Sequence, residues 1–122
     1  MSEKMIDPAY KAAEIYEDFF VKGMFNYWVP HLIDRAAPRA GERVLDVACG
    51  TGAAARAVVP IVGESGKVTG LDKSSAMLSV ACRKFSAYCD EIDWWEGVAE
   101  NMPFPWQNFD LVLCQQGLQF FT

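Results

Sequence analysis

Apolar residues in this chain follow two patterns that alternate along the sequence. Short, nearly continuous apolar runs are typical of strands buried in a parallel sheet, and stretches with apolar residues three or four positions apart are typical of helices. The runs lie at 43–47, 67–71, 92–96 and 109–114, and the helical stretches at 8–21, 24–37, 53–59 and 75–88. Pro30 is expected in the first turn of the second helix, and Pro60 just after the end of the third.

The alternation of these elements predicts an α/β fold with a parallel sheet and right-handed crossovers. We expect the strand order 3-2-1-4 of a Rossmann-like fold, preceded by N-terminal helices. This order places a ligand crevice between the first and fourth strands, where the direction of the connections reverses.

Aromatic residues are frequent in the segment that precedes the first strand. We expect residues 1–40 to form a helical cap or lid on a domain made by 41–122. Most of these aromatic side chains should pack as core, with Tyr10 or Tyr16 reaching the ligand site. His31 is the only histidine in the chain, and we expect it on a helix surface rather than as a catalytic base.

The first strand runs into a turn that contains two glycines. Asp46 stands near the end of the strand, Gly50 and Gly52 follow, and an alanine-rich helix begins at once. Glycines let the backbone approach a ligand closely or take a positive φ, and free N–H groups at the helix start would point into the pocket. A side chain at Gly52 is expected to fill space that the ligand needs. The pattern indicates a nucleotide-type pocket.

The acid beside this turn favours one class of ligand. The glycines also fit the dinucleotide pattern, so a nicotinamide-dependent dehydrogenase is an alternative. A dinucleotide would bring an anionic pyrophosphate toward Asp46, which would repel it. S-adenosyl-L-methionine instead carries an ammonium and a sulfonium, and we expect it as the cofactor. In the other interpretation, Asp46 is a buried acid that caps an ordinary turn.

A second acid follows the second strand. Asp72 lies about 20 residues past the glycine turn, the spacing at which an acidic residue binds ribose hydroxyls in such folds. The alternative is helix capping, because Asp72, Ser74 and Ser75 all precede a helix. Both roles are compatible if a serine caps the helix.

Three segments in order resemble those of class I S-adenosylmethionine-dependent methyltransferases, in particular the small-molecule branch that includes the ubiquinone and menaquinone biosynthesis type. They are LDVACGTG, GLD and GVAENMPFPWQNFDLVLCQQGLQFF. The resemblance covers about residues 10–122. It implies a small-molecule methyl acceptor and a cofactor pocket whose residues can be named.

By this resemblance, four groups of residues surround the cofactor. They are Asp46, Ala48, Gly50 and Gly52 around its methionine part, Asp72 at the ribose, Val98 and Ala99 beside the adenine, and Cys114 to Gln116 near the transferred methyl. Lys73 is also expected at the cofactor. No catalytic residue and no metal ligand is assigned.

The chain departs from the family pattern at two of these positions. The family often has Gly where Ala48 stands, which is a small change. It usually has an acid where Val98 stands, which accepts a hydrogen bond from the adenine amino group. The backbone near Val98 or Ala99, or the side chain of Glu100, would have to accept that bond here.

Composition and charge argue against several other classes of protein. The formal net charge of −5 argues against a nucleic-acid surface, no apolar run is long enough to span a membrane, and the N-terminus lacks a signal-peptide pattern. The four cysteines have no metal-site spacing, so we expect small buried thiols in a cytoplasmic protein.

The family sheet has seven strands, of which four are visible in this sequence. We therefore expect a truncated chain that lacks the C-terminal strands, is inactive alone, and self-associates through an exposed sheet edge. A non-catalytic S-adenosylmethionine-binding module is a further alternative.

Overall fold

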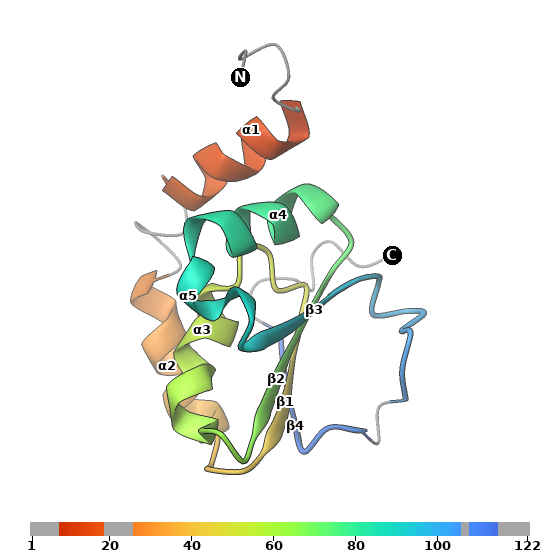
Figure 1. Ribbon diagram of the computed structural model, residues 1–122. Helices are drawn as coiled ribbons and strands as arrows, with labels where there is room; N and C mark the ends of the chain where they lie inside the picture. Colours follow the sequence, from red (N-terminus) through yellow and green to blue (C-terminus); the bar gives the residue numbers. More distant parts are fainter. Residues whose placement is uncertain (1–7, 19–25, 106–107, 115–122) are drawn as a thin grey trace.

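A single parallel sheet organises the computed structural model, which describes residues 8–18, 26–105 and 108–114 (Figure 1). Its strands are β1 (Arg43–Val47), β2 (Lys67–Asp72), β3 (Ile92–Glu96) and β4 (Leu111–Leu113). They lie in the order β3-β2-β1-β4, and each neighbouring pair is parallel. The predicted α/β fold and its strand order are confirmed.

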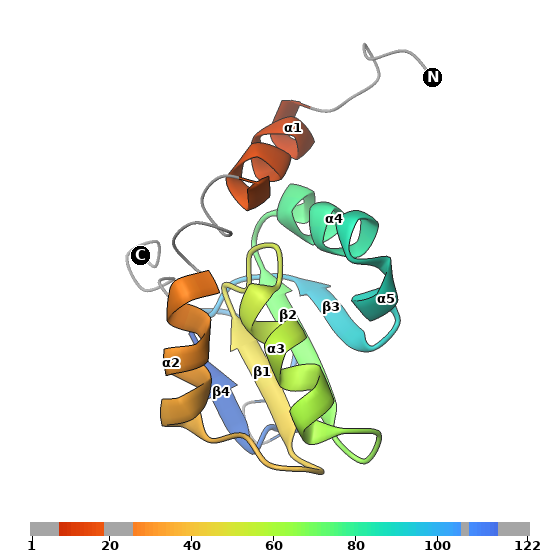
Figure 2. The same cartoon turned by 90° about the vertical axis from the view of Figure 1, so that its left-hand side faces the viewer.

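The described helices cover one face of this sheet and its carboxyl edge. They are α1 (Pro8–Ile15), α2 (Asn26–Ala36), α3 (Ala53–Val62), α4 (Ser75–Lys84) and α5 (Ser86–Cys89). Helices α2 and α3 lie in front of the sheet in Figure 2, and α1 lies beyond its carboxyl edge against α4. The segment between β3 and β4 passes over the opposite face (Figure 1).

The main core lies between the sheet and α3. Val44, Val68 and Ile92 stand side by side in register across three strands, and they pack against Val58 and Val62 of α3. All five side chains are almost fully buried. Burial of each contributes roughly 1.5–3 kcal/mol, so this layer fixes α3, and the turn that leads into it, against the sheet.

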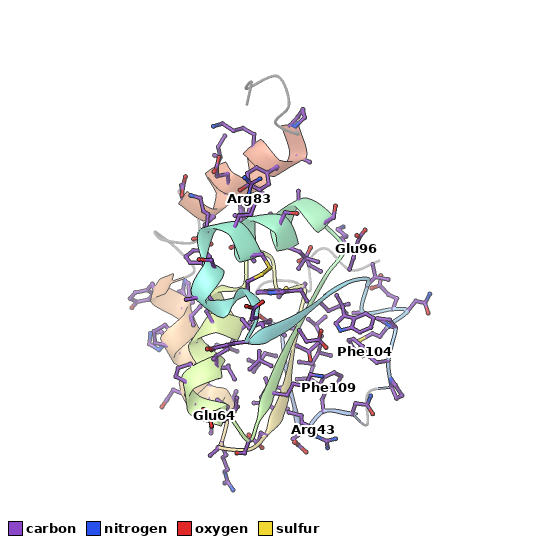
Figure 3. All side chains as sticks on the ribbon, viewed as in Figure 1. Arg43, Glu64, Arg83, Glu96, Phe104 and Phe109 are labelled. Atoms are coloured by element: carbon purple, nitrogen blue, oxygen red, sulfur yellow. A yellow bond between two sulfur atoms is a disulfide. The ribbon has the colours of Figure 1, made fainter. Side chains whose placement is uncertain are left out.

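The opposite face is less completely covered by described residues. Leu45, Val47 and Leu71 are buried there, whereas Val112 is 41% and Trp95 40% exposed. A cavity of about 300 Å³ lies on this face toward the amino ends of the strands, near the labelled Arg43, Phe104 and Phe109 of Figure 3. It lies at the end of the strands opposite the glycine turn.

The helices differ from the prediction at both prolines and at one break. Pro30 is the fifth residue of α2 rather than part of its first turn, and α3 continues through Pro60 to Val62. Pro60 is exposed, and having no N–H it cannot donate to the carbonyl of the preceding turn. The helix expected over 75–88 is interrupted at Phe85, where α4 ends and α5 follows.

This break brings two cysteines together, and the expectation of four free thiols is wrong for them. Cys82 and Cys89 form a disulfide with their Cα atoms 4.6 Å apart (Figure 3). In one continuous helix, seven residues would separate these atoms by about 10 Å. Cys49 and Cys114 are not part of a disulfide.

The aromatic residues near the N-terminus divide between core and surface. Tyr10 packs with Ala13 and Val80 between α1 and α4, as expected. Tyr27 and Trp28 are 64% and 48% exposed, so the expectation of core packing is wrong for them. Their rings contact each other and that of His31, which is on the surface of α2 as predicted. Phe19, Phe20 and Phe25 lie outside the described residues.

β1 ends in a turn with three residues at positive φ. These are Ala48 at 55°, Gly50 at 59° and Gly52 at 87°. An alanine in this region carries a steric penalty that glycine avoids. This explains in physical terms why a glycine would suit the position of Ala48.

We predict that Ala48→Gly stabilises the folded chain by about 1 kcal/mol, because it removes the left-handed strain on a residue with a Cβ. Chemical denaturation would measure the free energy of unfolding. The matched control is Ala57→Gly in the middle of α3, which should destabilise by about 1 kcal/mol. Equal losses in both variants would contradict the backbone argument.

Candidate functional site

The glycine turn lies at the carboxyl end of β1, between β1 and α3. Cys49 N–H donates to the Leu71 carbonyl at 2.9 Å, which ties the turn to β2. A Cβ built on Gly50 would meet no atom of the described residues within 4 Å, so among them the space beside this residue is open. Gly50 is therefore the position of the turn where a ligand can approach the backbone.

Gly52 is required for a different reason from the one expected. A Cβ at this position would lie 2.7 Å from the Trp94 ring, so the side chain would meet protein rather than ligand space. The expectation that a residue here would displace the ligand directly is corrected. Gly52 lets the start of α3 rest on the indole of Trp94.

Trp94 reaches this position because of the register of the sheet. Asp46, Gly70 and Trp94 are aligned across β1, β2 and β3, so their side chains point to the same face. Gly70 has no side chain, and a Cβ there would lie 2.9 Å from the Trp94 ring and 3.1 Å from Cys49 Sγ. The indole thus spans the gap over Gly70 beneath the turn.

Asp46 is a buried carboxylate under the start of α3. The residue is 2% exposed, its carboxylate accepts a hydrogen bond from the Ala55 backbone, and Oδ2 has no hydrogen-bond partner among the described residues. Burial raises the pKa of Asp46 to about 7; the Ala55 hydrogen bond opposes this change, and the charge of Asp72 adds to it. An unpaired buried carboxylate oxygen is costly, and a cation beside it would lower that cost.

Asp72 holds the turn from the end of β2. Its Oδ2 accepts from Gly50 N–H and its Oδ1 from Ser74 N–H, each at 2.8 Å. Ser74 Oγ accepts from Met77 N–H at 3.2 Å and is the N-cap of α4. Ser74 rather than Asp72 therefore caps α4. Asp72 remains available at the pocket, and its binding of a ribose stays a prediction.

Two further titratable groups approach these acids. Burial raises the pKa of the Cys49 thiol well above its usual value, and the charges of Asp46 and Asp72 raise it further. The pKa of Tyr16 is also raised, first by burial and then by the charges of Asp72 and Glu17. Cys49 is therefore a neutral thiol rather than a nucleophilic thiolate, and Tyr16 is the N-terminal tyrosine that comes near the site.

The other residues assigned to the cofactor are spread over the carboxyl end of the sheet. Ala48, Ala99 and Cys114 pack around the buried cluster of Leu45, Val47 and Leu71, on the face opposite α3. Lys73 is exposed between Asp72 and Ser74. Val98 is 36% exposed and forms an isolated antiparallel bridge with Asn101. Gln115 and Gln116 lie outside the described residues.

Sequence reasoning missed a group of residues that contacts the turn. Thr51 is part of the turn, Glu17 and Arg56 form hydrogen bonds to it, and Trp94 lies beside Gly52. Thr51 lies inside the glycine motif, and Arg56 is one helical turn after Gly52, so their spacing could have drawn attention to them. Glu17 is 34 residues from Thr51, and no local pattern identifies it.

Comparison with known proteins identifies the fold and the family. Residues 44–122 match the model of a family described as methyltransferase domain. The chain is similar to a 2-phytyl-1,4-naphtoquinone methyltransferase of Synechococcus elongatus, with 36% identity over 80% of this chain and 42% of the relative. It is similar to a ubiquinone/menaquinone biosynthesis C-methyltransferase, UbiE, of Hahella chejuensis, with 34% identity over 98% of this chain and 49% of the relative. The chain thus spans about half the length of these curated relatives.

Solved structures share this architecture. The YcgJ protein of Bacillus subtilis has a TM-score of 0.69 at 28% identity, with 80% of this chain and 41% of that chain covered. A protein of Methanococcus maripaludis titled as a putative S-adenosyl-L-methionine-dependent methyltransferase has a TM-score of 0.75 at 20% identity, with 100% and 57% covered. At that identity the second likeness shows the fold alone.

We predict that Asp46→Asn stabilises the ligand-free chain at pH 8 more than at pH 5.5. Because the pKa of Asp46 is raised in the folded state, the unfolded chain loses this proton first, and stability falls as pH rises toward about 7. From pH 5.5 to 8 this group should lower the free energy of unfolding by about 2 kcal/mol, and the Asn variant should lack that fall.

Denaturant titrations at several pH values would measure this difference. Asp34→Asn on the exposed surface of α2 makes the same change in net charge. It should leave the fall of the unfolding free energy with pH unaltered. If the free energy of unfolding of Asp46→Asn still falls between pH 5.5 and 8, another group causes the pH dependence.

Proposed function

Because the chain belongs to the methyltransferase domain family, we propose that it is the cofactor-binding part of an S-adenosyl-L-methionine-dependent methyltransferase that acts on a small molecule. The observation that carries the cofactor assignment is the buried Asp46 carboxylate with an unpaired oxygen beneath an open glycine turn. An anionic pyrophosphate would raise the cost of ionising Asp46, and a cationic ligand would lower it.

The residues present fit the three chemical parts of this cofactor. Asp46 supplies negative charge where the ammonium and sulfonium would lie, and the open space at Gly50 admits the ligand to the backbone. Asp72 can accept from two vicinal ribose hydroxyls, in addition to or in exchange for its present bonds to backbone amides. Backbone groups at Val98 and Ala99, or the side chain of Glu100, would have to accept a hydrogen bond from the adenine, since the Val98 and Ala99 side chains cannot.

The chemistry that the chain supplies is binding and positioning. S-adenosyl-L-methionine, when bound, supplies a methyl group on a sulfonium that is transferred by in-line displacement. The glycine turn and the two acids would hold the cofactor in one orientation, and positioning of this kind can account for much of a rate acceleration. Cys114, which directly follows β4, would lie near the transferred methyl if the family resemblance holds at this position.

The names of the curated relatives support a small organic acceptor, since one is named for a naphthoquinone and the other for ubiquinone and menaquinone biosynthesis. A cytoplasmic location remains a prediction, and the Cys82–Cys89 disulfide counts against it because disulfides are rare in the cytosol. Within the described part of the chain, no helix has the length and apolarity to cross a membrane.

We predict that the chain binds S-adenosyl-L-methionine and S-adenosylhomocysteine more tightly than NAD, as measured by titration calorimetry. The affinity for S-adenosyl-L-methionine should increase as pH rises toward 7, because its cationic groups favour ionised Asp46. Tighter binding of NAD would contradict the cofactor assignment.

We predict that Asp72→Ala weakens S-adenosylhomocysteine binding about tenfold or more, through loss of hydrogen bonds to a charged acceptor. The 2′-deoxy analogue of the ligand separates a ribose contact from a structural effect. If Asp72 binds the ribose, wild type and Asp72→Ala should differ much less in affinity for the deoxy analogue. An equal loss with both ligands would assign Asp72 to holding the turn alone.

We also propose that the chain self-associates through β4, which stands at the edge of the described sheet with Val112 41% exposed. An open edge offers unpaired N–H and C=O groups to another chain. Light scattering over a dilution series should show a mass that rises with concentration, and Val112→Lys should reduce this rise. Ile61→Lys changes an exposed apolar residue on α3, away from the edge, and should not. A monomer at every concentration would contradict the proposal.

A further inference from the structure

A buried glutamate joins the N-terminal helix to the glycine turn. Glu17 lies just after α1 and is 1% exposed. Its Oε1 accepts a hydrogen bond from Thr51 Oγ1 at 2.5 Å, and it lies 3.7 Å from the guanidinium of Arg56. Thr51 is the residue between Gly50 and Gly52, so a side chain from the N-terminal segment reaches the middle of the turn.

Arg56 contacts both Thr51 and Glu17, so the three residues form a closed group. Its Nη1 donates to the Thr51 carbonyl at 2.6 Å, and its guanidinium stacks 3.4 Å over the ring of Phe85. Thr51 is thus held by its hydroxyl through Glu17 and by its carbonyl through Arg56. Removal of one member of such a buried charged group is strongly destabilising because it leaves the other charge uncompensated.

The segment that carries Glu17 is attached on both sides to α4. Ala13 packs against Ala76 and Val80. Beyond Glu17, Asp18 pairs with Lys84 at 2.5 Å. These contacts place Glu17 over the turn only while α1 is docked on α4. Docking of α1 and the shape of the turn are therefore linked through one side chain.

We propose that Glu17 is a positioning residue that couples docking of α1 to the conformation of the cofactor-binding turn. This inference rests on the proposed function for the identity of the ligand. Glu17 fixes Thr51 and thereby holds the open Gly50 position toward the pocket. By thermodynamic linkage, a ligand on the turn must in return stabilise the docked state of α1. The N-terminal segment is then part of the cofactor-binding unit, and its docking controls the affinity for the ligand.

Two measurements on the 122-residue chain test this coupling. The first is hydrogen exchange at 8–18 and 49–56 in the absence of ligand, and the second is S-adenosylhomocysteine affinity by calorimetry. Glu17→Gln and Thr51→Val should each speed exchange at 49–56 and weaken binding about fivefold or more. The double variant should lose little beyond either single variant, because both changes break the same link. Bound ligand should slow exchange at 8–18 in the wild type but not in Glu17→Gln or Thr51→Val.

Matched controls separate this role from general stability. Thr51→Ser keeps the hydroxyl and should preserve both slow exchange and affinity. Glu14→Gln removes a neighbouring acid from the same segment, but the partly exposed pair with Lys11 that it breaks is worth little, so the turn should be unaffected. If Glu17→Gln fails to fold, the comparison of Thr51→Val with Thr51→Ser decides the question.

The possible failures are distinguishable. Unchanged exchange at 49–56 in folded Glu17→Gln or Thr51→Val would overturn the positioning role, whatever the ligand. A lower stability with unaltered affinity of the folded variants would also overturn it. If the wild type does not bind S-adenosylhomocysteine, the proposed function fails, and the exchange measurement still tests the link between Glu17 and the turn.

Discussion

The turn after β1 lies over the buried carboxylate of Asp46, and the rest of the structure depends on this arrangement. Three left-handed residues between 48 and 52 make the turn, and α3 begins directly over Asp46. Packing of α3 on Val44, Val68 and Ile92 holds this arrangement in place although Asp46 is costly to ionise. The hydrophobic core thus stabilises an acidic site that would not be stable alone.

The surroundings of the turn show how this site is kept in shape from several directions. Asp72 binds it from β2, Trp94 supports it from β3, and Glu17 contacts it from the segment after α1. These residues are distant in sequence and meet because the carboxyl ends of parallel strands share one edge. Loss of any one support should alter the backbone that the ligand contacts.

Much of the fold and of the turn could be predicted from the sequence, because local patterns of residues indicate them. The apolar runs marked the strands, the spacing of Asp46, Gly50, Gly52 and Asp72 marked the turn, and the strand order followed from βαβ connectivity. Contacts between distant residues carry no such pattern. Neither the Glu17–Thr51 bond nor the support of Gly52 by Trp94 is visible in spacing, and the break at Phe85 that pairs two cysteines depends on tertiary packing.

The position of Trp94 gives the turn an optical reporter. Its indole nitrogen is buried without a hydrogen-bond partner among the described residues, and its ring lies against Gly70 close to the Cys49 thiol. Trp28 and Trp95 are more exposed, at 48% and 40%. Emission from a partly buried indole is blue-shifted relative to that from more exposed ones, and a nearby thiol quenches it. A movement of the turn that separates Cys49 from Trp94 would therefore change the intensity at the blue edge of the spectrum, without any label attached to the protein.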